Sequence, residues 1–167
     1  GASDAPDALE RGSALHDLLE ILPEIPKEHW REWAQSLGKM HGALLAKATE
    51  ILTDETLAPV FGPDSLAEVD VTAQLPLMND RRLRGAIDRL VISDEAVLAV
   101  DFKSNPLVPA DEAEVPEAIL RQMGAYASAL EQIYPDKRIE TAILWTETAM
   151  LMPLAHRSVI EALQRAA

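Results

Sequence analysis

The chain has 167 residues, of which 48% are apolar, and this is enough for one globular domain with a buried core. It contains no cysteine, which excludes disulfides, zinc thiolate sites and iron–sulfur clusters. A net charge of −13 argues against tight, free-standing binding of nucleic acid through basic residues, and because no apolar run is long enough to span a bilayer we expect no membrane partner.

The order of the predicted elements indicates an α/β fold with one domain. The opening Gly-Ala-Ser (residues 1–3) is typical of a remnant of an expression tag, so we expect residues 4–167 to form a single domain excised from a larger protein. The elements described below add up to a central mixed sheet of about five strands flanked by helices.

The first third of the chain is predicted to be helical. Apolar residues at helical spacing indicate helices over 11–22, 29–48 and 50–61, and residues 4–10 read as a polar lead-in. His16 lies beside the apolar stripe of the first helix. Histidine in a helix usually has a structural role, but it is also a common transition-metal ligand, so His16 is either a packing residue or a third metal ligand.

The next part of the chain is predicted to be a hairpin. Alternation of polar and apolar residues indicates strands over 66–75 and 84–92, with a turn at Asn79-Asp80 between them. Glu68 lies on the polar face of the first strand, where it either faces solvent or points toward a metal pocket. The densest basic cluster follows the turn and comprises Arg81, Arg82, Arg84 and Arg89. This cluster either contacts phosphate or offsets the acidic charge of the chain, and we favour the second interpretation.

A third strand supplies the residues with the clearest chemistry. Residues 96–103 are apolar on both faces, as expected of a central strand, and a polar break at 93–95 separates them from the preceding strand. The two strands carry one acid each, Asp88 and Asp101, and Lys103 shares a face with Asp101. If the strands pair as a hairpin, both acids reach one pocket.

This set of residues suits metal-dependent hydrolysis of phosphodiesters. Two carboxylates bind a hard cation such as Mg²⁺, and the cation polarises the phosphoryl oxygen and lowers the pKa of a bound water. A neighbouring ammonium group orients or activates the nucleophile and offsets charge on phosphorus. The alternative is an acid that ends a strand beside a snorkelling lysine, but an apolar strand rarely ends in an inward acid–lysine pair without a use for it.

The last third of the chain completes the predicted fold. A helix over 116–134 carries Gln122 and Tyr126 four residues apart on one face, so both side chains can project toward the same cleft. Strands over 139–145 and 149–153 follow, and then a closing helix over 156–165.

Five short motifs occur in a characteristic order along the chain. They are G-x-x-x-H ending at His16, an acid at Glu68, G-x-I-D ending at Asp88, D-F-K-S beginning at Asp101, and Q-x-x-x-Y from Gln122 to Tyr126. This order resembles the RecB-like branch of the PD-(D/E)xK nucleases. Over nearly the whole chain the sequence is similar to the C-terminal nuclease domains of AddA-type helicase–nucleases of bacterial double-strand break repair, in their alphaproteobacterial form. Ser104 stands where that family usually has threonine.

The resemblance implies a fold, a cofactor and a set of site residues. The fold would be the restriction-endonuclease-like core of that superfamily, and the cofactor Mg²⁺, for which Mn²⁺ substitutes. The metal ligands would be His16, Asp88, Asp101 and the backbone carbonyl of Phe102. Lys103 would be the catalytic lysine, Glu68 an acid that flanks the metal, and Gln122 and Tyr126 cleft residues that contact substrate or orient the lysine.

The resemblance also implies a biological setting. The substrate would be single-stranded DNA, unwound by a helicase portion of the same polypeptide and cut by endo- or exonucleolytic hydrolysis during homologous recombination in the cytoplasm. An AddB-like subunit would be the partner; nuclease domains of that type hold an iron–sulfur cluster with cysteines, so the absence of cysteine favours the AddA type. The alternative is a catalytically silent protein-interaction module of a helicase–nuclease complex, and the presence of Asp88, Asp101 and Lys103 argues against it.

Overall fold

The computed structural model describes residues 4–167, with side chains from Asp7 onward, as two compact units, Gly1–Gly62 and Pro63–Ala167. The predicted tag remnant at residues 1–3 lies outside the described residues. None of the helices within residues 4–167 is both long enough and apolar enough to cross a membrane.

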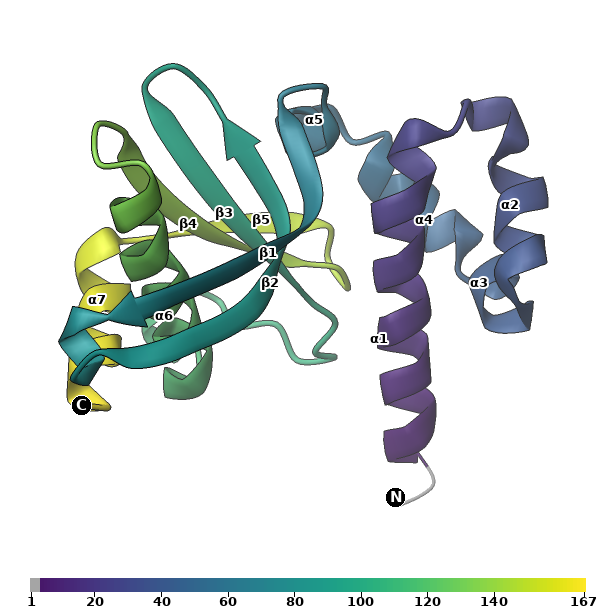
Figure 1. Ribbon diagram of the computed structural model, residues 1–167. Helices are drawn as coiled ribbons and strands as arrows, with labels where there is room; N and C mark the ends of the chain where they lie inside the picture. The colour runs from purple at the N-terminus through teal and green to yellow at the C-terminus, as the bar shows by residue number, and fades with distance from the viewer. Residues whose placement is uncertain (1–3) are drawn as a thin grey trace. The chain divides into compact units, whose positions relative to one another are not determined.

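The N-terminal unit consists of helices joined by short 3-10 turns (Figure 1). Its helices are α1 (Asp4–Ile21), α2 (Trp30–Leu37), α3 (Lys39–Ala43), α4 (Leu45–Leu52) and α5 (Ala58–Phe61). Residues 4–10, predicted as a polar lead-in, are the first part of α1. Pro6 does not prevent this, because in the first turn of a helix its missing N–H has no partner to lose.

Two of the predicted helices are broken into shorter ones. Gly38 has a φ of 155°, a value that other residues rarely adopt, and this separates α2 from α3 within the predicted helix over 29–48. The predicted helix over 50–61 is interrupted near Asp54, whose carboxylate accepts the backbone N–H of Thr56 at 2.9 Å and starts a new turn. Hydrophobic spacing alone carries no signal for either break.

Polar contacts within this unit tie the short helices together. The indole N–H of Trp30, on α2, contacts the carbonyl oxygens of Leu22 at 2.9 Å and Ile25 at 2.8 Å. His41, on α3, has its Nε2 atom 2.9 Å from a carboxylate oxygen of Asp17 on α1. These contacts explain how helices too short to be stable alone stay folded.

The second unit is a five-stranded mixed sheet covered by two helices. Its elements are β1 (Ser65–Leu75), β2 (Arg81–Ile92), β3 (Ala96–Lys103), α6 (Glu117–Ile133), β4 (Arg138–Trp145), β5 (Met150–Leu154) and α7 (His156–Arg165). The strands lie side by side in sequence order, and only β3 and β4 are parallel. The predicted mixed sheet is confirmed, and each predicted strand and helix of this unit is present with ends that differ by at most three residues.

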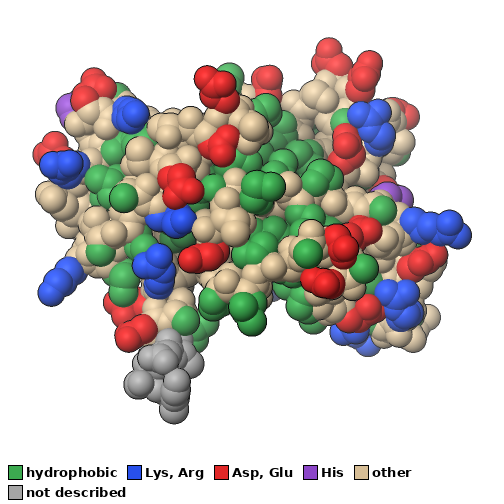
Figure 2. Space-filling model, turned by 180° about the vertical axis from the view of Figure 1, so that it is seen from behind, with side chains coloured by type: hydrophobic (Ala, Val, Ile, Leu, Met, Phe, Trp, Pro, Cys, Tyr) green, Lys and Arg blue, Asp and Glu red, His purple; other side chains and the backbone are tan. Residues whose placement is uncertain are grey.

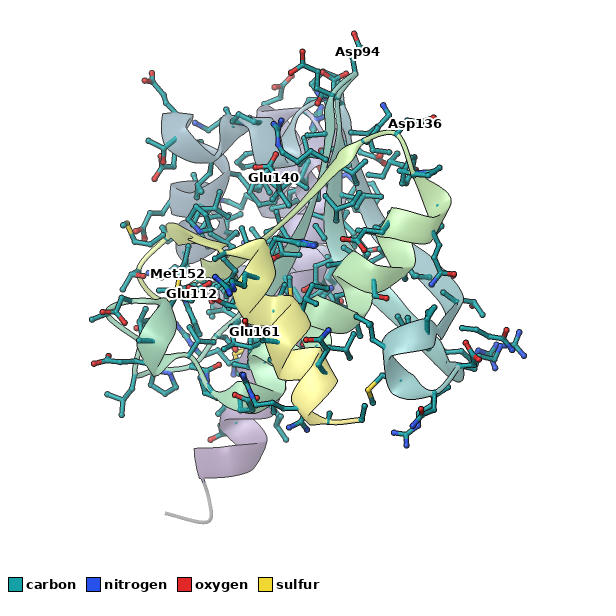
Figure 3. All side chains as sticks on the ribbon, turned by 90° about the vertical axis from the view of Figure 1, so that its left-hand side faces the viewer. Asp94, Glu112, Asp136, Glu140, Met152 and Glu161 are labelled. Atoms are coloured by element: carbon teal, nitrogen blue, oxygen red, sulfur yellow. The ribbon has the colours of Figure 1, made fainter. Side chains whose placement is uncertain are left out.

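The turns of the sheet follow the chemistry of their residues. Asn79 and Asp80 join β1 to β2 with φ values of 55° and 59°, a left-handed conformation that asparagine and aspartate tolerate better than other side chains. The polar segment around Asp94, at the tip of the β2–β3 hairpin, projects from the sheet (Figure 3). The predicted β2–β3 hairpin is therefore confirmed.

The core of this unit lies between the sheet and the pair formed by α6 and α7, which lie side by side (Figures 1 and 3). Met123 and Ala127 on α6 are fully buried against the central strands. Gly124 lies where the two helices are closest, since a Cβ atom there would come within 2.1 Å of the backbone oxygen of Val159. The absence of a side chain at this position allows α7 to pack directly on α6.

Candidate active site

Two acids face each other where β1 and β2 pair. Ala67 on β1 pairs with Arg89 on β2, so the next residues, Glu68 and Asp88, occupy facing positions. Glu68 has a φ of 48°, which is unusual for a residue in a strand, and the Glu68–Asp88 position is skipped in the ladder although the register continues beyond it. Facing carboxylates repel, and strained backbone beside such a pair is typical of functional sites.

A third acid lies at the same level on β3. Arg89 pairs with Val100 at the end of the β2–β3 ladder, so Asp88 and Asp101 stand one step beyond it on neighbouring strands. Both are buried, with 9% and 5% of their surface exposed. The hairpin thus brings the two predicted acids together, and Glu68 extends the row to β1.

The path of β2 changes at this level. Ile87 and Leu90 both belong to the core, although residues three apart in a flat strand point to opposite faces. The strand therefore bends between them, at Asp88 and Arg89, and both of these residues are buried. Arg89 directs its Nε atom to the hydroxyl of Ser65 at 3.2 Å, so this member of the predicted basic cluster is part of the interior.

Where the β2–β3 ladder ends, the side chain of Asp88 replaces the backbone as the hydrogen-bond acceptor for β3. Its Oδ2 atom accepts the backbone N–H of Phe102 at 2.7 Å. The carbonyl of the next residue, Lys103, accepts the N–H of Thr146 at 2.9 Å, on the side of the loop after β4. Because backbone groups of successive strand residues point to alternate sides, the carbonyl of Phe102, a predicted metal ligand, points toward β2 and Asp88.

Asp101 and Lys103 form an ion pair at the end of β3. The Nζ atom of Lys103 lies 3.0 Å from Oδ2 of Asp101. That oxygen is nevertheless buried without an aligned hydrogen bond, so the contact with the ammonium group is one of charge and proximity. A carboxylate oxygen without an aligned hydrogen bond still has a lone pair for a cation, so Oδ2 of Asp101 fits a metal ligand.

A chain of hydrogen bonds connects Lys103 to the backbone of β2. Lys103 donates to Oε1 of Gln122 at 3.3 Å, and Nε2 of Gln122 donates to the hydroxyl of Tyr126 at 3.3 Å. Tyr126 in turn donates to the carbonyl of Ala86 at 3.1 Å. Gln122 and Tyr126 lie four residues apart on α6, as the predicted common face requires, and the chain fixes the ammonium group from the helix side.

The glycine of the G-x-I-D motif has a steric role that its sequence context did not indicate. A Cβ atom at Gly85 would lie 3.3 Å from both Cε1 and the hydroxyl of Tyr126. This is tighter than nearly all Cβ contacts, so a larger residue would displace the tyrosine ring. Gly85 therefore lets α6 approach β2 closely enough for the hydrogen bond to Ala86.

The electrostatic environment keeps Tyr126 protonated. Burial raises the pKa of its hydroxyl above the ordinary value of 10.0, and the negative charges of Asp101 and then Asp88 raise it further, against the hydrogen bond from Gln122. Tyr126 is therefore a hydrogen-bond donor to Ala86 at neutral pH.

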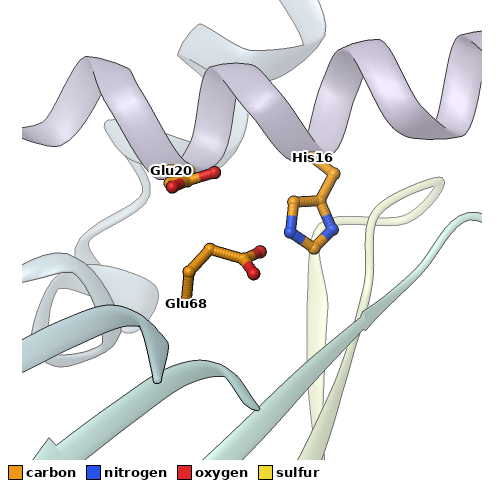
Figure 4. A group of neighbouring side chains, drawn as sticks. All are labelled: His16, Glu20 and Glu68. Atoms are coloured by element: carbon orange, nitrogen blue, oxygen red, sulfur yellow. The ribbon is translucent and has the colours of Figure 1, made fainter. Parts of the chain in front are cut away.

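The predicted histidine ligand belongs to the other unit. His16 and Glu20 lie one turn apart on α1 and project from the same side of that helix (Figure 4). Glu20 was not among the predicted site residues, although its position four residues after His16 places both side chains on one face of the helix. Glu68 extends from β1 in the sheet unit (Figure 4).

The sheet unit alone presents a site with a definite chemical character. It brings together two buried carboxylates, an ammonium group paired with one of them, and a third acid facing the other, carried by Asp101, Lys103, Asp88 and Glu68. The oxygen donors suit a hard divalent cation such as Mg²⁺ rather than a soft metal. The ammonium group beside them suits a reaction in which negative charge develops.

Comparison with known proteins agrees with this chemistry. The family model described as the PD-(D/E)XK nuclease superfamily matches residues 2–152, which is most of the chain. No curated protein matches the chain.

Proposed function

The chain belongs to the PD-(D/E)XK nuclease superfamily, and from this premise we propose that it cuts single-stranded DNA exposed by an attached helicase. Nucleases of this superfamily use divalent metal ions, and the five-stranded mixed sheet flanked by helices is consistent with their fold. The substrate, the helicase and the setting in repair are our proposals.

The observation that carries the proposal is the group formed by Asp88, Asp101 and Lys103. Asp88 and Asp101 occupy adjacent positions of β2 and β3, and one buried oxygen of Asp101 has no aligned hydrogen bond although an ammonium nitrogen lies 3.0 Å away. A purely structural acid–lysine pair has no need for a second acid at its side, because the pair is already neutral.

We propose that Asp88 and Asp101 hold Mg²⁺, with the carbonyl of Phe102 and the imidazole of His16 as further ligands. Mn²⁺, which accepts the same oxygen and imidazole donors, would substitute. When bound, such a cation supplies Lewis-acid polarisation of the phosphoryl oxygen and lowers the pKa of water. Glu68, facing Asp88, adds negative potential that favours a cation at this end of the sheet.

Lys103 has the central role in the hydrolysis. Its ammonium group, fixed by Asp101 and Gln122, orients the attacking water and offsets negative charge on the phosphorus oxygens. Water supplies the oxygen that bonds to phosphorus as the P–O3′ bond breaks, which leaves a 5′-phosphate and a 3′-hydroxyl. Gln122 and Tyr126 hold the lysine in place and would contact the substrate.

The proposed setting is that of an AddA-type helicase–nuclease in the repair of double-strand breaks by homologous recombination, in the cytoplasm. The five ordered motifs and the absence of cysteine support this type. The net charge of −13 also fits, since a helicase portion of the same polypeptide, together with an AddB-like subunit, would deliver the strand.

Cleavage of labelled single-stranded DNA with Mg²⁺ or Mn²⁺ tests the proposal. We expect Asp101→Asn and Lys103→Met to reduce cleavage by at least about 100-fold, as loss of one charge-stabilising group does in other enzymes. Asp94→Asn is the matched control, because it exchanges an exposed carboxylate for an amide on the turn of the same hairpin. Equal cleavage by all four proteins would place the chemistry elsewhere. A wild-type chain that cuts no DNA with either metal would support the silent interaction module instead.

A further inference from the structure

Three arginines at the start of β2 are exposed, and two of them, Arg82 and Arg84, lie on the face opposite Leu83. Arg81, Arg82 and Arg84 are exposed, whereas Leu83 packs against the core and Gly85 faces the ring of Tyr126. Three of the 15 lysines and arginines of the chain therefore lie exposed within four residues at the start of β2. We refer to Arg81, Arg82 and Arg84 as the hairpin arginines.

Ion pairing bears on the two explanations for this cluster. Arginines that offset acidic charge by direct contact lie beside carboxylates, as three other exposed arginines do, although Arg31 and Arg121 form no ion pair with a described residue either. The three pairs are Arg138–Glu140 at 3.3 Å, Arg157–Glu161 at 3.1 Å and Arg165–Glu117 at 2.7 Å. Within residues 4–167, no side chain of a hairpin arginine has an ion pair or hydrogen bond with a described residue. The three guanidinium groups are therefore available to an external anion, whereas the interpretation favoured from the sequence was neutralisation of the acidic chain.

A groove beside the hairpin arginines gives such an anion a place. It has a volume of about 430 Å³ and is lined by Arg84, Gly85, Asp70, Val71 and Thr72. Thr72 pairs with Arg84 across the two strands, so a hydroxyl and a guanidinium stand together at one end. Asp70 would repel an anion at its own position, which confines the anion to the end of the groove at Arg84.

The position of the groove relates it to the acids of the site. Arg84 precedes Asp88 by four residues on β2, a separation of about 13 Å along an extended strand. A nucleic-acid strand with one phosphate at Asp88 and Asp101 would therefore carry neighbouring phosphates toward the hairpin arginines. Acidic side chains are spread over the face seen in Figure 2, so a local group of cations matters more on this protein than on a basic one.

We propose that the hairpin arginines, with Thr72, bind the phosphate backbone of the DNA strand next to the point of cleavage. The inference rests on the proposed function for the identity of the strand. Arginine is suited to this task because its planar guanidinium binds phosphate oxygens through two hydrogen bonds at once. The contacts are to backbone phosphates, so they carry no sequence preference.

Binding measured without cleavage tests this inference separately from the nuclease activity. Fluorescence anisotropy of a labelled oligo-dT strand, in EDTA and at a series of NaCl concentrations, gives Kd and its salt dependence. The test variant is Arg81→Ala/Arg82→Ala/Arg84→Ala. The matched control is Arg138→Ala/Arg157→Ala/Arg165→Ala, which changes the net charge by the same amount but removes arginines that are already paired.

We expect weak binding by the wild-type chain, and a Kd at least about tenfold higher in the test variant. The slope of log K against log salt should fall by about 2, since each lost phosphate contact on a single strand contributes about 0.7. The control variant and the triple substitution of the hairpin arginines by lysine should keep the slope of the wild type. A test variant with the slope of the wild type would overturn the inference, and so would a wild-type chain that binds no DNA. If the wild-type chain shows this pattern of binding but cuts no DNA with Mg²⁺, the proposed function is contradicted. The inference that the hairpin arginines bind DNA would still hold in that case.

Discussion

At the scale of single residues, the site is defined by charges that would not be placed together for stability. Glu68, Asp88 and Asp101 stand at one level of three adjacent strands, two of them are buried, and one has a left-handed φ. Lys103 offsets one of these charges. Carboxylates gathered at one level of a sheet favour the binding of a cation, and such a group is typical of sites that bind metals or substrates.

Asp88→Asn separates the function of this carboxylate from its structural role. The amide oxygen can still accept the N–H of Phe102, while the negative charge facing Glu68 is lost. We expect cleavage to be abolished and the melting temperature, measured in EDTA, to be unchanged or higher than that of the wild type. A melting temperature clearly below that of the wild type would mean that the charge of Asp88 stabilises the fold.

The raised pKa of Tyr126 makes the free energy of unfolding depend on pH in the alkaline range. The pKa of its hydroxyl is raised in the folded state, so below about pH 10 the hydroxyl is protonated in both the folded and the unfolded chain. The contribution of this hydroxyl to the free energy of unfolding is fully present in that range. As the pH rises further, the unfolded chain loses the proton first, and the contribution is lost as the pH passes through the raised pKa.

We therefore expect the free energy of unfolding of the wild type to fall above about pH 10 more steeply than that of Tyr126→Phe. Urea denaturation at a series of pH values measures this difference. Parallel pH profiles for the two proteins would show that the hydroxyl of Tyr126 ionises as easily in the folded chain as in the unfolded one.

At the scale of elements, the strands and helices of the sheet unit could be predicted from the sequence, whereas in the helical unit the helical content could be predicted and the breaks could not. Alternation of polar and apolar residues indicates the strands β1 to β5, and helical spacing of apolar residues indicates α6 and α7. Polar turns such as Asn79-Asp80 mark the ends of these elements. The breaks in the helical unit depend on the φ of Gly38 and on a side-chain hydrogen bond of Asp54, and hydrophobic spacing contains neither.

The candidate site follows the same division. Asp88, Asp101 and Lys103 could be predicted to converge because a two-residue period and a hairpin fix their positions. The steric role of Gly85, the bond from Phe102 to Asp88 and the change of direction in β2 depend on contacts between elements distant in sequence. The metal role of His16 remains a prediction based on its motif.

The contact between α6 and α7 sets the position of Gln122 and Tyr126. Gly124→Ala would bring a methyl group to within 2.1 Å of the backbone oxygen of Val159, and backbone cannot move aside as a side chain can. We expect a loss of about 1–3 kcal/mol in the free energy of unfolding, or more. Ala118→Gly, at an exposed position in the first turn of α6, is the control and should cost at most about 1 kcal/mol from helix propensity. Urea denaturation of both variants measures these changes in the free energy of unfolding. A Gly124→Ala protein as stable as the wild type would show that α6 and α7 can move apart at no cost.

At the scale of the whole molecule, the chain combines a strongly acidic surface with a reaction on a polyanion. A net charge of −13 weakens any encounter with DNA, and the hairpin arginines counter it only locally. A domain of this kind works best on a strand that another part of the enzyme holds nearby, because delivery at high local concentration replaces intrinsic affinity. This agrees with the proposed place of the chain beside a helicase.

The central claim is that Asp88 and Asp101 jointly hold a divalent cation, and calorimetric titration of the chain with Mn²⁺ in the absence of DNA tests it most directly. We predict binding by the wild type and by Asp94→Asn, and loss of that binding in both Asp88→Asn and Asp101→Asn. Undiminished binding of Mn²⁺ by the Asp88→Asn and Asp101→Asn proteins would contradict the claim.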